Sequence, residues 1–217
     1  MPAVLYDKSA DGRIATVTLN RPAVLNAYNV EMRDALYETL LAVRDDPEVR
    51  VMILRGTGRA FSTGGDVREF GTAPSPIAAR SVRWRRDVWG TLRSLPQLTL
   101  AAVHGLAVGG GLEMMLLCDL AIASSDARFA LPETGLAMIP GVGGTQTLPR
   151  LIGQGRAADL VLTGRWLDAP SAARLGLVSR LVPRRRLLPA ATALARRLAQ
   201  LAPSLVREVK RELRAME

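Results

Sequence analysis

The stretch VHGLAVGGGLE, residues 103–113, joins a buried strand to a helix through three consecutive glycines. The apolar run at residues 98–103 predicts a strand that is covered on both faces. The glycines at 109–111 then begin a helix that is expected to extend to about residue 117. The first N–H groups of a helix have no partner within it, and the positive end of its dipole lies there. This stretch therefore predicts a strand, a tight turn and a helix start that can face a ligand.

Strands and helices alternate along the rest of the chain. Short apolar or alternating runs predict strands at residues 14–20, 49–55, 98–103, 120–123, 127–130 and 178–182. Capping residues and helical periodicity predict a helical turn at 68–71 and helices at 30–45, 77–95, 145–152, 156–162, 187–201 and 204–216. Asn29 is expected to cap the first of these helices, and Asp168 a further short one. The alternation predicts an α/β fold.

Composition limits the class of protein. At 217 residues the chain is long enough for one domain with a short appendage. Its 48% hydrophobic and 23% charged residues are typical of a globular enzyme and not of a disordered segment. The single Cys118 excludes an internal disulfide framework and is expected to be a small core residue. With no signal peptide and no run of about 18 apolar residues, we expect a cytoplasmic protein without membrane insertion.

The chain is basic, with a formal net charge of +9 and a pI of about 11.0. Such a charge can serve nucleic acid, a membrane surface or a polyanionic small molecule. Almost all of it is arginine, because Lys8 and Lys210 are the only lysines. No recognisable nucleic-acid-binding motif of interleaved basic and aromatic residues accompanies this charge, so we do not expect dedicated nucleic-acid binding.

A second glycine-rich turn, FSTGGD at residues 61–66, follows the predicted strand at 49–55. Its simplest interpretation is a tight turn between a strand and a helix. Together with the turn at 109–111, it could donate a second N–H to one ligand oxygen and so form an oxyanion hole. Phosphate binding is the other use of such turns, but neither the lysine-containing phosphate loop nor the full dinucleotide fingerprint is present.

Two glutamates lie within glycine-rich surroundings. Glu113 ends the stretch quoted above, and Glu133 precedes IPGVGGT at residues 139–145. Either could be an acid in the first turn of a helix, where the dipole favours it. Together they could move a proton and a water while the N–H groups stabilise an enolate.

Other polar residues carry weaker signals. His104, the only histidine, lies at a strand end and is expected to be structural. No cluster of residues has the spacing of metal ligands, so we expect no metal. Four arginines of the predicted helix at 77–95 could form a solvated or subunit-contacting face, or bind the phosphates of a ligand: Arg80, Arg83, Arg85 and Arg86.

The chain resembles the crotonase superfamily, the enoyl-CoA hydratase/isomerase family. The matching motifs are NRP with LNA at residues 20–27, AFSTGGD at 60–66, VHGLAVGGGLE at 103–113, CDLAIA at 118–123, and residues 129–144. They occur in the family's order over roughly residues 5–210. The family carries alanine at many of its equivalents of Gly65, a change that a backbone donor tolerates.

The resemblance implies a crotonase-like spiral of repeated ββα units in residues 1–184, with C-terminal helices in residues 185–217. This C-terminal segment is shorter than the family pattern, which continues past Met216. The resemblance also implies an acyl-CoA thioester as partner and assembly as a homotrimer or hexamer. It implies no cofactor, because CoA is part of the substrate.

The resemblance assigns roles to individual residues. The N–H groups of Gly65 and Gly110 are expected to form the oxyanion hole, Glu113 and Glu133 to be the catalytic acids, and Gly141 to help hold the water. Substrate contacts are expected at Ser62, Gly65, Asp66, Val67, Arg68 and Gly110. The sequence does not decide between the glutamates, although we favour Glu113 for activating water and Glu133 for relaying a proton.

Possession of both glutamates favours an enoyl-CoA hydratase. Alternatives are an isomerase or another acyl-CoA lyase on the same scaffold, and an RNA-binding member of the superfamily, which the basic charge would suit. A non-catalytic scaffold is a further alternative, but retention of Glu113 and Glu133 disfavours it.

Overall fold

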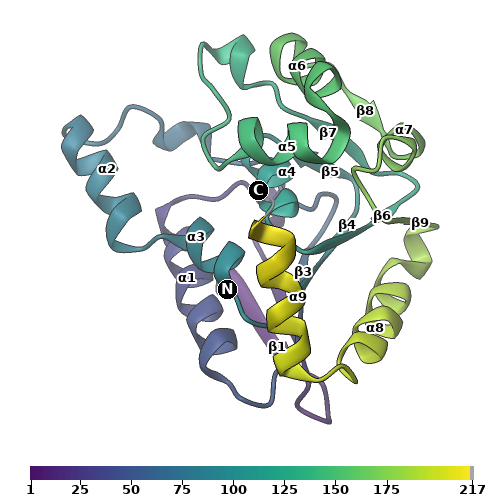
Figure 1. Cartoon of the computed structure of the whole chain (residues 1–217). Helices are drawn as coiled ribbons and strands as arrows, with labels where there is room; N and C mark the ends of the chain where they lie inside the picture. The colour runs from purple at the N-terminus through teal and green to yellow at the C-terminus, as the bar shows by residue number, and fades with distance from the viewer. Residues whose placement is uncertain (216–217) are drawn as a thin grey trace.

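We describe residues 1–215 in a computed structural model of the chain, in which two sheets are covered by helices (Figure 1). Six strands form the larger sheet in the order β1-β2-β3-β4-β6-β9, and only β1 runs antiparallel to its neighbour. Their bounds are β1 (Val4–Lys8), β2 (Ile14–Leu19), β3 (Val51–Gly56), β4 (Leu98–Val103), β6 (Leu120–Ser124) and β9 (Arg180–Val182). The smaller sheet has β7 (Arg128–Ala130) between β5 (Leu106–Val108) and β8 (Leu167–Asp168).

The α-helices are α1 (Val30–Asp45), α2 (Pro76–Arg85), α3 (Val88–Ser94), α4 (Gly110–Leu116), α5 (Gly144–Ile152), α6 (Gln154–Thr163), α7 (Ala169–Arg174), α8 (Leu187–Leu198) and α9 (Pro203–Ala215). Four short 3-10 helices are η1 (Pro22–Val24), η2 (Val67–Glu69), η3 (Glu133–Leu136) and η4 (Arg184–Arg186). The expected caps are present, since Asn29 accepts a hydrogen bond from the N–H of Met32 and Asp168 accepts one from Ser171.

Consecutive strands leave one sheet for the other. β4 and β6 belong to the larger sheet, whereas β5 and β7, which follow them, belong to the smaller one. A helix follows each pair: α4 comes after β5, and η3 and α5 come after β7. The α/β spiral of repeated ββα units is therefore confirmed.

Alternate side chains of the larger sheet enter two cores. In β3, Met52 and Leu54 join the main core with α1, α3, α4 and α5, whereas Val51 and Ile53 face the opposite side. There α8 covers the sheet through apolar residues such as Leu194. Because successive side chains enter two different apolar cores, a central parallel strand is apolar at every position in the sequence.

A buried cluster of charges attaches α9 to the sheet. Nζ of Lys210 donates to the carbonyls of Leu95 and Gln97, at 2.8 and 2.5 Å, and lies 2.7 Å from Oδ2 of Asp119. Arg214 pairs with Oδ1 of the same carboxylate at 3.1 Å. Lys210 is only 6% exposed, so this end of the chain is held by polar contacts that water does not screen.

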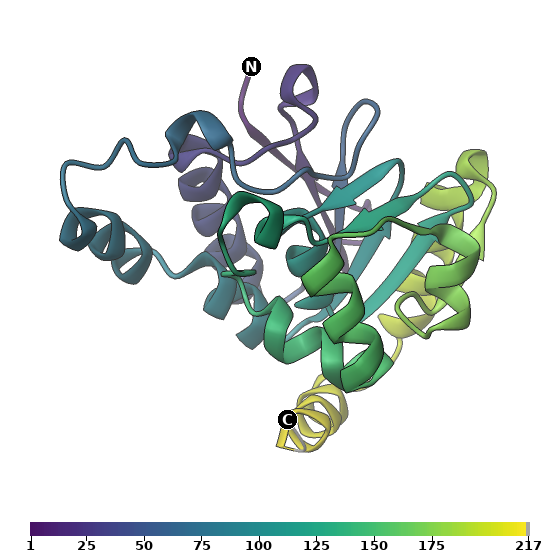
Figure 2. The same ribbon diagram turned by 90° about the horizontal axis from the view of Figure 1, so that it is seen from above.

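The structure corrects one expected helix. Residues 77–95 form two helices, because the chain breaks at Arg86 and Asp87 caps α3 by accepting a hydrogen bond from Gly90. α2 has no buried residue and projects from the body of the molecule in both views (Figure 2). Short elements also escaped the sequence patterns, among them β1, β5, β8 and η3. The expected end of the last helix at Met216 lies outside the described residues.

Candidate active site

The two glycine-rich turns lie against each other. Ser62 pairs with β5, donating its N–H to Leu106 at 3.1 Å and accepting one from Val108 at 3.0 Å. This pairing brings the turn after β3 to the start of α4, where a Cβ placed on Gly64 would lie 2.8 Å from the nitrogen of Gly110. The sequence placed these turns at strand ends, and the tertiary structure brings them together.

The N–H groups of Gly65 and Gly110 are available to a ligand. Gly110 is the first residue of α4, so its N–H has no partner within the helix. Gly65 forms an isolated bridge with Tyr28 that uses the N–H of Asp66 and the carbonyl of Gly64 instead. Within residues 1–215, neither the Gly65 nor the Gly110 N–H donates to another residue.

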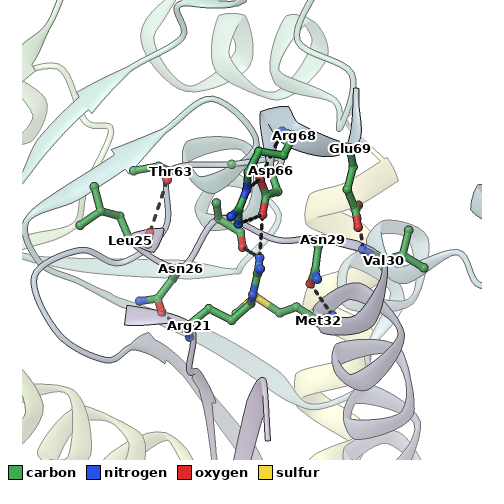
Figure 3. A network of polar contacts seen from close by, with 12 residues as sticks. Arg21, Leu25, Asn26, Asn29, Val30, Met32, Thr63, Asp66, Arg68 and Glu69 are labelled. Atoms are coloured by element: carbon green, nitrogen blue, oxygen red, sulfur yellow. Dashed lines mark hydrogen bonds and ion pairs between the residues drawn. The ribbon is translucent and has the colours of Figure 1, made fainter. Parts of the chain in front are cut away.

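Three of the expected substrate contacts around this turn differ in burial: Ser62 and Asp66 are buried, whereas Val67 is exposed. Ser62 is fully buried, and its hydroxyl donates to the carbonyl of Asn26 at 2.8 Å. It therefore stabilises the turn from the protein interior. Asp66 is 6% exposed and forms ion pairs with Arg68 at 2.7 Å and Arg21 at 3.1 Å (Figure 3). These arginines hold the pKa of the Asp66 carboxyl well below its usual range. Val67 is exposed, and so can contact a ligand directly.

Glu113 is a buried carboxylate on the inner face of α4. It is 2% exposed, and its Oε1 accepts hydrogen bonds from the N–H groups of Val142 at 2.8 Å and Gly144 at 2.7 Å. Burial raises its pKa, while those N–H groups act in the opposite direction. The sequence analysis named Gly141 in this segment and did not indicate that Val142 and Gly144 donate to Glu113. Gly141 itself is exposed, one residue before Val142.

Glu133 begins η3 and faces the same turn from the other side. Its Oε1 lies 3.0 Å from the position that a Cβ on Gly109 would take, and its Oε2 is buried without a hydrogen-bond partner in the described chain. Burial is the main cause of the raised pKa of Glu133, and the negative charge of Glu113 raises this pKa further. Glu113 and Glu133 thus interact electrostatically, and one oxygen of Glu133 has no hydrogen-bond partner in the described chain. Such a pair of carboxyls is suited to proton transfer.

Tyr28 is a residue of this site that sequence reasoning missed. A Cβ placed on Gly110 would overlap the Tyr28 hydroxyl. Burial and the charges of Glu113 and Glu133 all raise the pKa of the phenol. Tyr28 follows directly on the LNA motif, but nothing in the local pattern indicates which way its side chain points.

The arginines of the 77–95 region have different surroundings. Arg80 stacks over Trp84 at 4.2 Å, and Arg86 pairs with Glu38 of α1 at 3.1 Å. Arg83 is exposed, and its positive charge acts to lower the pKa of both Glu113 and Tyr28.

His104 lies apart from these groups. Its Nε2 is 3.1 Å from the carbonyl of Gly58, and burial lowers its pKa. Within residues 1–215 no three or more His, Cys, Asp and Glu side chains gather where they could bind a metal ion. In the same range, every helix is too short or too polar to cross a membrane.

Comparisons with known proteins show which family this chain and its fold belong to. The model of the enoyl-CoA hydratase/isomerase family matches residues 9–216. The probable enoyl-CoA hydratase echA8 of Mycobacterium tuberculosis (strain CDC 1551 / Oshkosh) is 40% identical over 200 residues, which are 92% of this chain and 77% of that protein. The 2,3-dehydroadipyl-CoA hydratase of Escherichia coli (strain K12) is 37% identical over 206 residues, 95% of this chain and 80% of that protein. The crystal structure of an enoyl-CoA hydratase from Bacillus anthracis superposes with a TM-score of 0.90 at 36% identity, covering 97% of this chain and 82% of that one.

Proposed function

This chain belongs to the enoyl-CoA hydratase/isomerase family and is an enoyl-CoA hydratase, and from that premise we propose how its residues add water across the 2,3 double bond of a 2-enoyl-CoA. One observation carries the proposal. Two carboxyls with raised pKa values, Glu113 and Glu133, border a turn where Gly65 and Gly110 offer two unused N–H groups.

The N–H groups of Gly65 and Gly110 hold the thioester oxygen. As water attacks carbon 3, the electrons of the double bond move toward the thioester and this oxygen gains negative charge. Fixed donors that are already in place stabilise such charge without reorganisation. The start of α4 adds the positive end of its dipole.

Glu113 accepts the proton of the attacking water. Val142 and Gly144 both donate to Oε1, so Oε2 stays available to the water. Gly141 lies beside these donors and supplies a further N–H for the same water. The carboxylate is held in one orientation by these bonds, which a general base requires.

Glu133 delivers a proton to carbon 2 of the enolate. Its buried, unpartnered Oε2 and the neighbouring charge of Glu113 both favour the protonated form. The reaction balances, because the proton that leaves water ends on Glu113 and the proton that reaches carbon 2 comes from Glu133. Solvent exchange between the two carboxyls restores the starting state.

A panel of 2-enoyl- and 3-enoyl-CoA thioesters of different chain lengths tests this proposal. We expect hydration of at least one 2-enoyl-CoA by the purified protein. Movement of the double bond without any addition of water would favour the isomerase alternative and overturn the proposed roles.

We also propose that the chain assembles as a homotrimer or a dimer of trimers. An exposed apolar face supports this assembly: Leu205, Val209 and Leu213 of α9 are 55%, 47% and 64% exposed and border a cavity of about 540 Å³. Such patches mark contact surfaces more often than solvated ones. Light scattering at micromolar concentration tests it, and a monomer alone would contradict it.

The cytoplasm is the compartment that we propose for this enzyme. The support is chemical: Cys118 is a free thiol, and reducing compartments keep such thiols intact. Fractionation of cells that express the full chain tests the assignment.

A further inference from the structure

Tyr28 is attached to the turn that carries Gly65. Its N–H donates to the carbonyl of Gly64 at 2.8 Å, and its carbonyl accepts the N–H of Asp66 at 2.9 Å. These two bonds enclose Gly65, so the backbone of Tyr28 fixes the orientation of the Gly65 N–H. The side chain therefore starts next to one of the two proposed oxyanion donors.

The ring of Tyr28 then reaches the other donor. It packs edge-on against Trp89 of α3, with ring centroids 5.0 Å apart and an interplanar angle of 60°. The hydroxyl of the ring held by this contact lies against Gly110, so close that it would overlap a Cβ there. The phenol thus spans the distance between the two glycine turns.

No residue in the range 1–215 accepts a hydrogen bond from the Tyr28 hydroxyl. It is not enclosed either, since the buried polar atoms without partners in that range do not include it. Its pKa is raised, so the group keeps its proton at all pH values at which the enzyme would work. A hydroxyl whose proton has no acceptor within the protein is free to donate to a ligand.

We propose that Tyr28 donates a third hydrogen bond to the thioester oxygen, beside the N–H groups of Gly65 and Gly110, and so stabilises the enolate. This inference rests on the proposed function. The thioester oxygen is the ligand acceptor that Gly110 would hold, and the hydroxyl lies against Gly110. Donation strengthens as negative charge develops, so the contact favours the transition state over the bound substrate.

The test compares Tyr28→Phe with Tyr37→Phe. The first removes the hydroxyl and keeps the ring against Trp89, and the second removes a hydroxyl from α1, outside the site. Two ligands separate the effects: 3-oxobutanoyl-CoA, which ionises to an enolate and is followed by its ultraviolet absorbance, and saturated butanoyl-CoA. For Tyr28→Phe we expect kcat and enolate affinity to fall about ten- to a hundredfold, with little change in butanoyl-CoA affinity. Tyr37→Phe should match the unmodified protein.

A second variant guards against a purely structural effect. Tyr28→3-fluoro-Tyr keeps the shape and makes the phenol a stronger donor, so enolate affinity should rise. Equal losses for both ligands in Tyr28→Phe, or no loss, would overturn the inference, as would unchanged enolate affinity in the fluorinated variant. If the unmodified protein hydrates no substrate, the proposed function fails instead, and the enolate measurements still decide the role of Tyr28.

Discussion

Oε1 of Glu113 accepts a hydrogen bond of 2.7 Å from the N–H of Gly144, the first residue of α5. The bond joins α4, which starts in the glycine turn at residues 109–111, to the segment that follows Glu133. It gives Glu113 two tasks, because the carboxylate both fixes the chain at 142–144 and is positioned by it. Its structural and chemical contributions can be separated by substitution.

Glu113→Gln should keep the fold and lose activity. The amide oxygen can still accept from Val142 and Gly144, but the group no longer accepts a proton from water. We expect kcat to fall about 10²- to 10⁴-fold with a melting temperature close to that of the unmodified protein. Glu113→Ala should also lower the free energy of unfolding by about 1–3 kcal/mol, because two N–H groups lose their acceptor. Normal turnover in folded Glu113→Gln would contradict the assignment.

Glu133→Gln should lose activity and gain stability at neutral pH. The folded pKa of Glu133 is raised, so the folded protein holds that proton more tightly than the unfolded chain. The free energy of unfolding therefore falls as pH rises from the unfolded to the folded pKa, and the ionised carboxylate destabilises the fold above that range. Thermal unfolding should show an advantage for Glu133→Gln at neutral pH that shrinks in acid. A constant difference across pH would show that this carboxyl does not carry the effect.

The pH profile of kcat/KM should report the environment of Glu113. As the proposed base, it must be ionised, and burial raises its pKa above the ordinary value of 4.5. The acid limb of the profile is therefore expected above that value, and activity should rise through it as pH increases. The residual activity of Glu113→Gln should lack this limb. An unchanged limb in that variant would assign it to another group.

Alanine should have unequal effects at the two oxyanion glycines. A Cβ on Gly65 would lie 2.9 Å from Cε1 of Phe70, an exposed side chain that can move away. A Cβ on Gly110 would overlap the Tyr28 hydroxyl, whose ring is held by Trp89. We expect near-normal kcat in Gly65→Ala and at least about a tenfold loss in Gly110→Ala.

The control for that comparison is Gly110→Pro, which removes the donor itself. It should lose at least about a hundredfold in kcat. Kinetics and melting temperature measured on the same preparations separate lost chemistry from lost folding. A folded Gly110→Pro protein with normal turnover would eliminate the oxyanion role.

Lys210→Met should destabilise the chain without changing the chemistry. Methionine retains the apolar stem of the side chain but leaves the carbonyls of Leu95 and Gln97 without the Lys210 donor, and removes one of the two cations that pair with Asp119. Removal of one partner from a buried pair predicts a loss of about 3 kcal/mol in the free energy of unfolding. Specific activity of the folded fraction should stay unchanged. The exposed Arg207→Met on the same helix is the matched control and should have little effect.

The sequence alone determined the fold class, the order of the main elements and the family to which the chain belongs. The buried face of α1, with Met32, Leu36, Leu40 and Val43, matched the helical period without error. Such features are local, because period, capping and glycine turns are set by residues a few positions apart. Short strands such as β8 left no periodic signal, and the break before Asp87 was hidden by the helical propensity on either side of it.

Only the tertiary structure decided how the site is assembled. It placed Ser62 and Asp66 in supporting contacts, joined Glu113 to Val142 and Gly144, and set the Tyr28 hydroxyl against Gly110. The sequence supplied the groups that carry the chemistry and the turns on which they lie. Which groups meet depends on side-chain direction and on contacts between residues 29 to 82 positions apart, and local pattern does not encode either of these.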